Sequence, residues 1–125
     1  TAAFTLTQVC LPLLQSVDDA SVVFTLDDAA ARPKAFWGAY GVSKAGLSSL
    51  VKMFAVEHEQ SDRLRFNGID PGPRQTPLRA KAFPTEDPSA QPPETIADTY
   101  VHLLSAAARG TTGQILGADG QPIAA

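Results

Sequence analysis

A tyrosine and a lysine four residues apart, in the segment YGVSK at residues 40–44, are the residues best suited to do chemistry. In a helix, residues at this spacing lie on one face, about a turn apart. An ammonium beside a phenol favours the phenolate, so we expect Lys44 to lower the pKa of Tyr40 from its ordinary value of ~10 toward neutrality. Such a phenol can give or take a proton at a carbonyl or alcohol oxygen. The same pair could instead be a packed aromatic and a solvated lysine, and the surrounding residues must decide.

The elements that must position this pair are predicted to alternate along the chain. The apolar run SVVFTL, rich in β-branched residues, is typical of a strand buried on both faces. The strands are expected at residues 21–26, 64–69 and 114–117. Helical spacing of apolar residues predicts the flanking helices. They are expected near residues 3–15, 40–59 and 94–108. This order predicts a right-handed parallel β-α-β-α-β unit, an α/β fold of three parallel strands with flanking helices in a single domain of residues 1–125.

Three segments resemble the short-chain dehydrogenase/reductase family, in the family's order. Residues 37–45, WGAYGVSKA, are similar to the start of the family's active-site helix. Residues 65–72, RFNGIDPG, are similar to the next strand and its Pro-Gly turn, and residues 78–88, LRAKAFPTEDP, resemble a YciK-like branch. The resemblance implies a truncated Rossmann-like three-layer unit. It corresponds to the second half of an oxidoreductase that uses NAD or NADP on carbonyls and alcohols.

The resemblance also assigns roles to individual residues. Tyr40 would be the catalytic acid or base, and Lys44 would lower its pKa and hold the ribose of the cofactor. Both would therefore contact the cofactor. Pro71, Gly72 and Thr76 would line the nicotinamide side of the site. The cofactor would supply the hydride, and the protein would orient it.

Two parts of the family pattern are missing from these residues. No glycine-rich turn of the kind that holds a pyrophosphate at a helix N-terminus is present. The position thirteen residues before Tyr40, where the family has its catalytic serine, is Asp27, and Asp28 follows it. A carboxylate cannot donate a hydrogen bond to a substrate oxygen, and it opposes a neighbouring phenolate. We therefore expect impaired oxidoreductase chemistry and weak or no cofactor binding by this chain alone. The alternatives are a non-catalytic remnant that dimerises or binds a ligand, and a new activity recruited onto the half-fold.

Composition narrows the partners that we expect. The net charge of −3 gives no reason to expect nucleic-acid or anionic-membrane binding. The single cysteine, Cys10, fits a reducing cytoplasm. The histidines have no cysteine or carboxylate at metal-ligand spacing, so no metal site is predicted. The helices at 3–15 and 40–59 carry more apolar surface than a small sheet can cover, which predicts a homodimer or larger homo-oligomer, with a small-molecule substrate if the chain is active.

Overall fold

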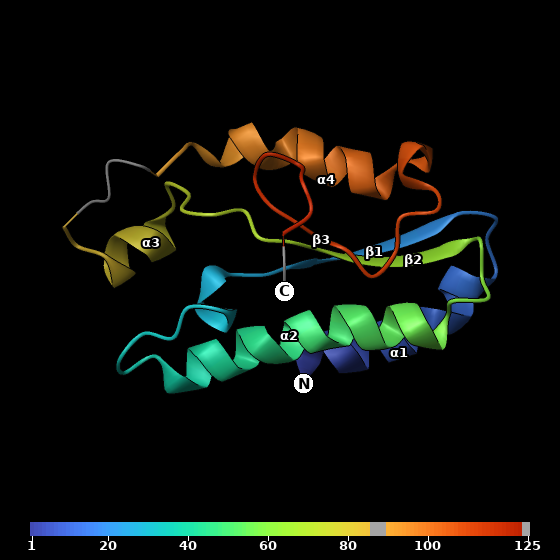
Figure 1. The fold of residues 1–125 in the computed structure, drawn as a ribbon, viewed down its shortest axis with the longest axis horizontal. Helices are drawn as coiled ribbons and strands as arrows, with labels where there is room; N and C mark the ends of the chain where they lie inside the picture. The colour runs from blue at the N-terminus through green and yellow to red at the C-terminus, as the bar shows by residue number, and fades with distance from the viewer. Residues whose placement is uncertain (86–89, 124–125) are drawn as a thin grey trace.

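A three-stranded parallel sheet lies between helices in the computed structural model, which describes residues 1–85 and 90–123 (Figure 1). The strands are β1 (Ala20–Thr25), β2 (Leu64–Ile69) and β3 (Ile115–Leu116), in the order β1-β2-β3. The α-helices are α1 (Ala2–Gln15), α2 (Gly38–Glu57), α3 (Pro77–Ala82) and α4 (Ala97–Leu104). Helices α1 and α2 lie on one face of the sheet and α4 on the other (Figure 1). The predicted three-layer α/β unit is therefore confirmed. The last residues of the 78–88 segment lie outside the described residues.

Strand pairing follows the predicted parallel order, but the third strand is shorter than expected. β1 and β2 pair along their whole length, from Ala20 opposite Leu64 to Thr25 opposite Ile69. β3 contributes two residues instead of the predicted 114–117. It ends early because the amide of Gly117 donates to the carbonyl of Gln121 (2.8 Å), which turns the chain back on itself.

The helix predicted at 94–108 is divided into three pieces. A 3₁₀ turn, η2 (Pro93–Ile96), leads into α4, and a second 3₁₀ turn, η3 (Ala106–Ala108), follows it. Ser105 separates α4 from η3 because its backbone is extended, with φ −94° and ψ 167°. Its hydroxyl then accepts a hydrogen bond from the amide of Ala107 (3.3 Å), which caps η3.

Two hydrophobic clusters join the layers. Between the sheet and the pair α1 and α2, the stacked rings of Phe24, Phe54 and Phe66 form the centre of the larger cluster. On the opposite face, Leu103 of α4 packs in a smaller cluster with residues of β2 and β3. The middle of β1 is half-buried rather than covered on both faces as predicted. β1 is an edge of the described sheet, so a neighbouring strand covers it on one side only.

An ion-pair network joins the loops at the amino ends of β1 and β2. Arg65 of β2 is 2% exposed, forms an ion pair with Asp19 and donates a hydrogen bond to the carbonyl of Ser105 (3.1 Å). Arg109 Nε lies 3.4 Å from the same Asp19 carboxylate. The hydrogen bond from Arg65 is the main reason that the pKa of Asp19 lies below its ordinary value.

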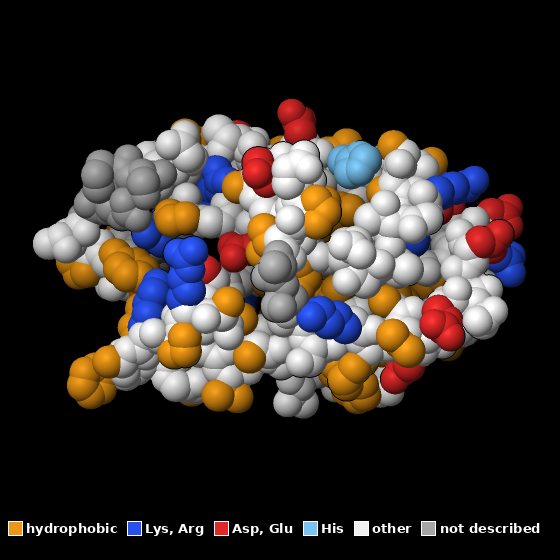
Figure 2. All heavy atoms as spheres, in the orientation of Figure 1, with side chains coloured by type: hydrophobic (Ala, Val, Ile, Leu, Met, Phe, Trp, Pro, Cys, Tyr) orange, Lys and Arg blue, Asp and Glu red, His pale blue; other side chains and the backbone are white. Residues whose placement is uncertain are grey.

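Large apolar side chains remain exposed on the two helices of one layer. On α1 they are Leu6, Val9 and Leu13, and on α2 they are Val42, Met53 and Val56, all at least half exposed. Hydrophobic side chains are visible along the edge of the molecule formed by these helices (Figure 2). The two helices therefore bury only part of their apolar surface against the three-stranded sheet.

Candidate active site

The carboxyl ends of the strands surround a cavity of about 630 Å³. Three acidic and three basic side chains line it, together with aromatic rings and two glycines. These residues are Asp27, Asp28, Asp70, Arg32, Lys34, Arg79, Trp37, Phe83, Gly72 and Gly117. Lysine and arginine side chains gather beside a hollow at the left of the molecule in Figure 2. Parallel sheets place ligands at this edge, because the loops that follow the strands meet there.

Tyr40 lies beside this cavity in the first turn of α2, with its hydroxyl directed at Asp27. The phenol donates a hydrogen bond to Asp27 Oδ2 (3.1 Å), and Asp27 Oδ1 accepts from the amide of Ala29 (2.8 Å). Burial, followed by the hydrogen bond and charge of Asp27 and the charges of Asp28 and Asp70, raises the pKa of Tyr40 to about 12. The expectation of a lowered pKa is therefore wrong. The carboxylates disfavour the phenolate, and Tyr40 keeps its proton at neutral pH.

Lys44 lies one turn along α2, on the same face as Tyr40, as its spacing predicted. Its Nζ donates to the carbonyl of Thr25 at the end of β1 (3.3 Å) and lies 5.5 Å from the centre of the Tyr40 ring. The ammonium of Lys44 therefore faces the Tyr40 ring and the end of β1, whereas the Tyr40 hydroxyl is hydrogen-bonded to the carboxylate of Asp27. This difference in contact explains why Lys44 does not lower the pKa of Tyr40.

An aromatic wall borders the same cavity. Trp37 meets the Tyr40 ring edge-on, with centroids 5.3 Å apart, and stacks on Phe83 at 5.5 Å. Lys34 Nζ lies over both the Trp37 and Phe83 rings, at 5.6 and 5.4 Å, and 3.7 Å from Asp28 Oδ1. The wall and Asp28 together already hold one ammonium group.

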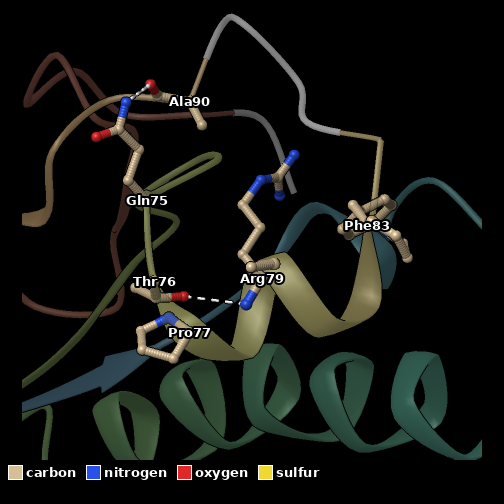
Figure 3. Close-up of a pocket in the computed structure, with 8 residues that line it drawn as sticks. Gln75, Thr76, Pro77, Arg79, Phe83 and Ala90 are labelled. Atoms are coloured by element: carbon tan, nitrogen blue, oxygen red, sulfur yellow. Dashed lines mark hydrogen bonds between the residues drawn. The ribbon is translucent and has the colours of Figure 1, made fainter.

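The residues predicted to face the nicotinamide do not share one cavity. Gly72 borders the larger cavity, and its φ of +64° is strained for other residues. Pro71 precedes it, and the Pro71 carbonyl accepts a hydrogen bond from Arg74 Nε (2.7 Å). Thr76 instead lines a neighbouring cavity of about 330 Å³, where its hydroxyl accepts from the amide of Arg79 (3.1 Å) and caps α3 (Figure 3).

A hydrogen bond joins two segments of the chain at the rim of this second cavity. Gln75 Nε2 donates to the carbonyl of Ala90 (3.0 Å), opposite the start of α3 (Figure 3). Arg79 and Phe83 line both cavities. Thr76 therefore lines a different cavity from Gly72, although the two cavities share part of their walls.

The site fits the nicotinamide end of a dinucleotide better than its pyrophosphate. A Cβ built at Gly72 would meet no atom within 4 Å, so a flat ring can approach the backbone there. Across residues 1–85 and 90–123, the glycines with positive φ are Gly72, Gly110, Gly113 and Gly120, and none directly precedes a helix. The described residues thus offer Tyr40, Lys44 and Gly72 to the nicotinamide and ribose, but no phosphate-binding turn.

Comparison with known proteins agrees with this geometry. The family model described as enoyl-(acyl carrier protein) reductase matches residues 1–120. A crystal structure of a short chain dehydrogenase from Salmonella enterica serovar Typhi superposes with a TM-score of 0.87 at 40% identity, over 94% of this chain and 48% of that one. The chain belongs to the short-chain dehydrogenase/reductase family. The uncharacterized oxidoreductase YciK of Escherichia coli K12 is 42% identical over 122 residues, which are 97% of this chain and 47% of that protein.

A further structural relative has a bound cofactor. The short chain dehydrogenase of Shigella flexneri 2a, crystallised with NADP, has a TM-score of 0.87 at 41% identity, over 94% of this chain and 49% of that one. The likeness to the YciK branch predicted from residues 78–88 is confirmed. The chain spans about half the length of the curated relatives that it matches.

Sequence reasoning found Tyr40, Lys44, Asp27 and Gly72 but did not find several other residues of the cavity wall. Lys34, Phe83 and Asp70 were not predicted as site residues. Asp70 directly follows β2 and precedes the Pro-Gly turn, which was an available signal. No sequence pattern links Lys34 to Phe83. The two side chains meet only because Phe83 stands at the end of α3 in the folded chain.

Neither a metal-binding cluster nor a membrane-spanning helix is found in the part of the chain that the structure describes. Among residues 1–85 and 90–123, no group of three or more histidine, cysteine, aspartate or glutamate side chains is arranged to hold a metal ion. In the same residues no helix combines the length and the apolar character needed to cross a membrane.

Proposed function

We propose that this chain supplies the acid–base half of an NAD(P)-dependent oxidoreductase, with carbonyl or alcohol chemistry as its family suggests. The observation that carries the proposal is the Tyr40 hydroxyl, which donates to Asp27 Oδ2 at the edge of the cavity that Asp27 and Gly72 both line. A relative of 41% identity crystallised with NADP supports this choice of cofactor.

The roles of the residues follow from their positions. When bound, the cofactor supplies the hydride. Tyr40 holds a proton at a high pKa, so it acts as the acid in reduction and is a poor base at neutral pH. Lys44 fixes the end of β1 and offers a positive charge to the ribose, and Gly72 lets the nicotinamide ring reach the backbone.

Asp27 limits this chemistry. The proton that Tyr40 would give to a substrate oxygen is already directed to Asp27 Oδ2. A substrate must displace that hydrogen bond, and a transition-state donor lost from the serine position costs about 10²–10³ in rate in comparable sites. We therefore propose that this chain alone neither binds NADPH or NADH tightly nor reaches a normal enzyme rate.

Titration calorimetry with NADPH and NADH tests both parts of the proposal. We expect no micromolar binding by the 125-residue chain alone, because the described residues lack a pyrophosphate cradle. Micromolar binding that Tyr40→Phe or Lys44→Ala abolishes, and that the exposed-lysine control Lys52→Ala preserves, would refute the impairment. It would still support the oxidoreductase assignment.

The oxidoreductase assignment has its own test. The chain is joined to a dinucleotide-binding half taken from a relative of the YciK branch. NADPH oxidation by this fusion should then depend on Tyr40. Equal turnover by the fusion and its Tyr40→Phe variant would refute the assignment.

A second candidate function is a dimerising module without catalysis. The observation that favours it is the apolar surface of α1 and α2, where Val9 and Leu13 are 70% and 72% exposed. We propose that these helices pair between two copies of the chain. A cytoplasmic location is proposed with it, because Cys10, half-buried on α1, fits a reducing compartment.

A further inference from the structure

The site has an unusual polarity for a protein that handles a carbonyl group. A ligand oxygen within reach of Tyr40 also faces Asp27, and an oxygen and a carboxylate repel each other because both are acceptors. The Tyr40 proton does not relieve this repulsion, because it is already donated to Asp27. A ligand group that carries its own protons matches these partners better.

We propose that this cavity selects a planar cation with a protonated nitrogen, of the amidinium or iminium class, whose N–H group donates to Asp27. The proposal rests on the proposed function only in taking the Tyr40 cavity as the substrate site. It names the substrate class that this site prefers over neutral carbonyl compounds. Hydrogen bonds between two charged partners are about twice as strong as those between neutral ones, which gives Asp27 the energy to discriminate.

The charges around the Tyr40 hydroxyl support a cationic ligand at this point. Asp27, Asp28 and Asp70 all act to raise the pKa of Tyr40, so the charges nearest its hydroxyl are negative, although Arg32, Lys34 and Arg79 line the same cavity. Lys44 faces the ring and the carbonyl of Thr25 rather than the hydroxyl. A cation placed next to Asp27 therefore relieves the repulsion among the carboxylates.

The aromatic wall supports a planar ligand in the same cavity. Trp37 and Phe83 are stacked 29° from parallel, and the Lys34 ammonium already lies over both rings and beside Asp28. A cation of the chain itself therefore already lies against this wall. Lys34 would compete with a bound cation, since both carry positive charge in one cavity.

Benzamidine and benzamide provide a matched pair of probes, because they have the same shape and differ in charge. Their binding is measured by calorimetry and by quenching of Trp37, the single tryptophan of the sequence. We expect benzamidine to bind about tenfold or more tightly than benzamide, because both probes can donate an N–H to Asp27 but only benzamidine brings a positive charge to the carboxylate. Asp27→Asn should bring the ratio close to one, because asparagine keeps the shape and the acceptor for the Ala29 amide. Lys34→Met should increase the affinity for benzamidine by removing the competing charge.

Asp18→Asn is the matched control, since it removes the same charge from a fully exposed side chain before β1, at the opposite end of that strand from Asp27. It should leave the ratio unchanged. Equal binding of the two probes, binding of neither, or a preference that survives Asp27→Asn would overturn the proposal. Circular dichroism of each variant confirms that it is folded. A benzamidine preference without any Tyr40-dependent turnover in the fusion would leave this inference standing and reject the proposed function. Tyr40-dependent turnover with a benzamide preference would do the reverse.

Discussion

Replacing Asp27 by asparagine should lower the pKa of Tyr40, because it removes one negative charge and changes little else. The Tyr40 hydroxyl and Asp27 Oδ2 are 3.1 Å apart. At that distance two unit charges repel by about 1.3 kcal/mol even with the full dielectric screening of water, which corresponds to about one pH unit in the pKa of the phenol. Burial is the largest cause of the elevation to about 12, and it remains in the variant. The pKa should therefore fall only part of the way toward its ordinary value.

NMR of isotopically labelled tyrosine measures this change directly, since the sequence contains two tyrosines. At pH 11 about a tenth of the Tyr40 phenol should be ionised in the native chain and about half in Asp27→Asn. Tyr40 in the Asp18→Asn variant should titrate as it does in the native chain. An unchanged Tyr40 titration in Asp27→Asn would refute the explanation that the neighbouring carboxylate contributes to the raised pKa of the phenol.

Three further predictions concern stability and association. Because the folded pKa of Tyr40 lies at about 12 and the unfolded one at 10.0, both states carry the proton below pH 10, so the free energy of unfolding should fall as the pH rises from 10 to 12; Tyr40→Phe should remove this component in urea titrations. Asp19→Asn should lower the free energy of unfolding at pH 7 more than Asp18→Asn does, because it leaves the buried Arg65 without its main partner. Because the pKa of Asp19 is lowered in the folded state, the difference in free energy of unfolding between the two variants should shrink as the pH falls below 3.8. A difference that persists in acid would contradict the ion-pair explanation. The Leu13 side chain is 72% exposed, so Leu13→Asp should shift sedimentation toward the monomer without changing circular dichroism. A native chain that is monomeric at tens of micromolar, which limits the free energy of association to ~5–6 kcal/mol, would refute the dimer.

The strand and helix order could be predicted from the sequence because it depends on local patterns. The predicted strand at 64–69 coincides with β2, in which every residue is buried. The spacing of Tyr40 and Lys44 was sufficient to place both on one face of α2, since helical periodicity fixes that relation. The position of Asp27, thirteen residues before Tyr40, was also readable from the motif.

The state of the phenol was decided by tertiary structure. Local spacing puts Lys44 next to Tyr40, but the path of the chain after β1 brings the Asp27 carboxylate to the hydroxyl and leaves the ammonium over the ring. Local details of the folded chain also decided two element boundaries. β3 is short because the Gly117 amide donates to the carbonyl of Gln121, and the last helix is divided because the backbone of Ser105 is extended. The sign of a pKa shift depends on which charge is nearest in space. Residues far apart in the sequence, such as Lys34 and Phe83, become neighbours only when the loops between the elements are folded.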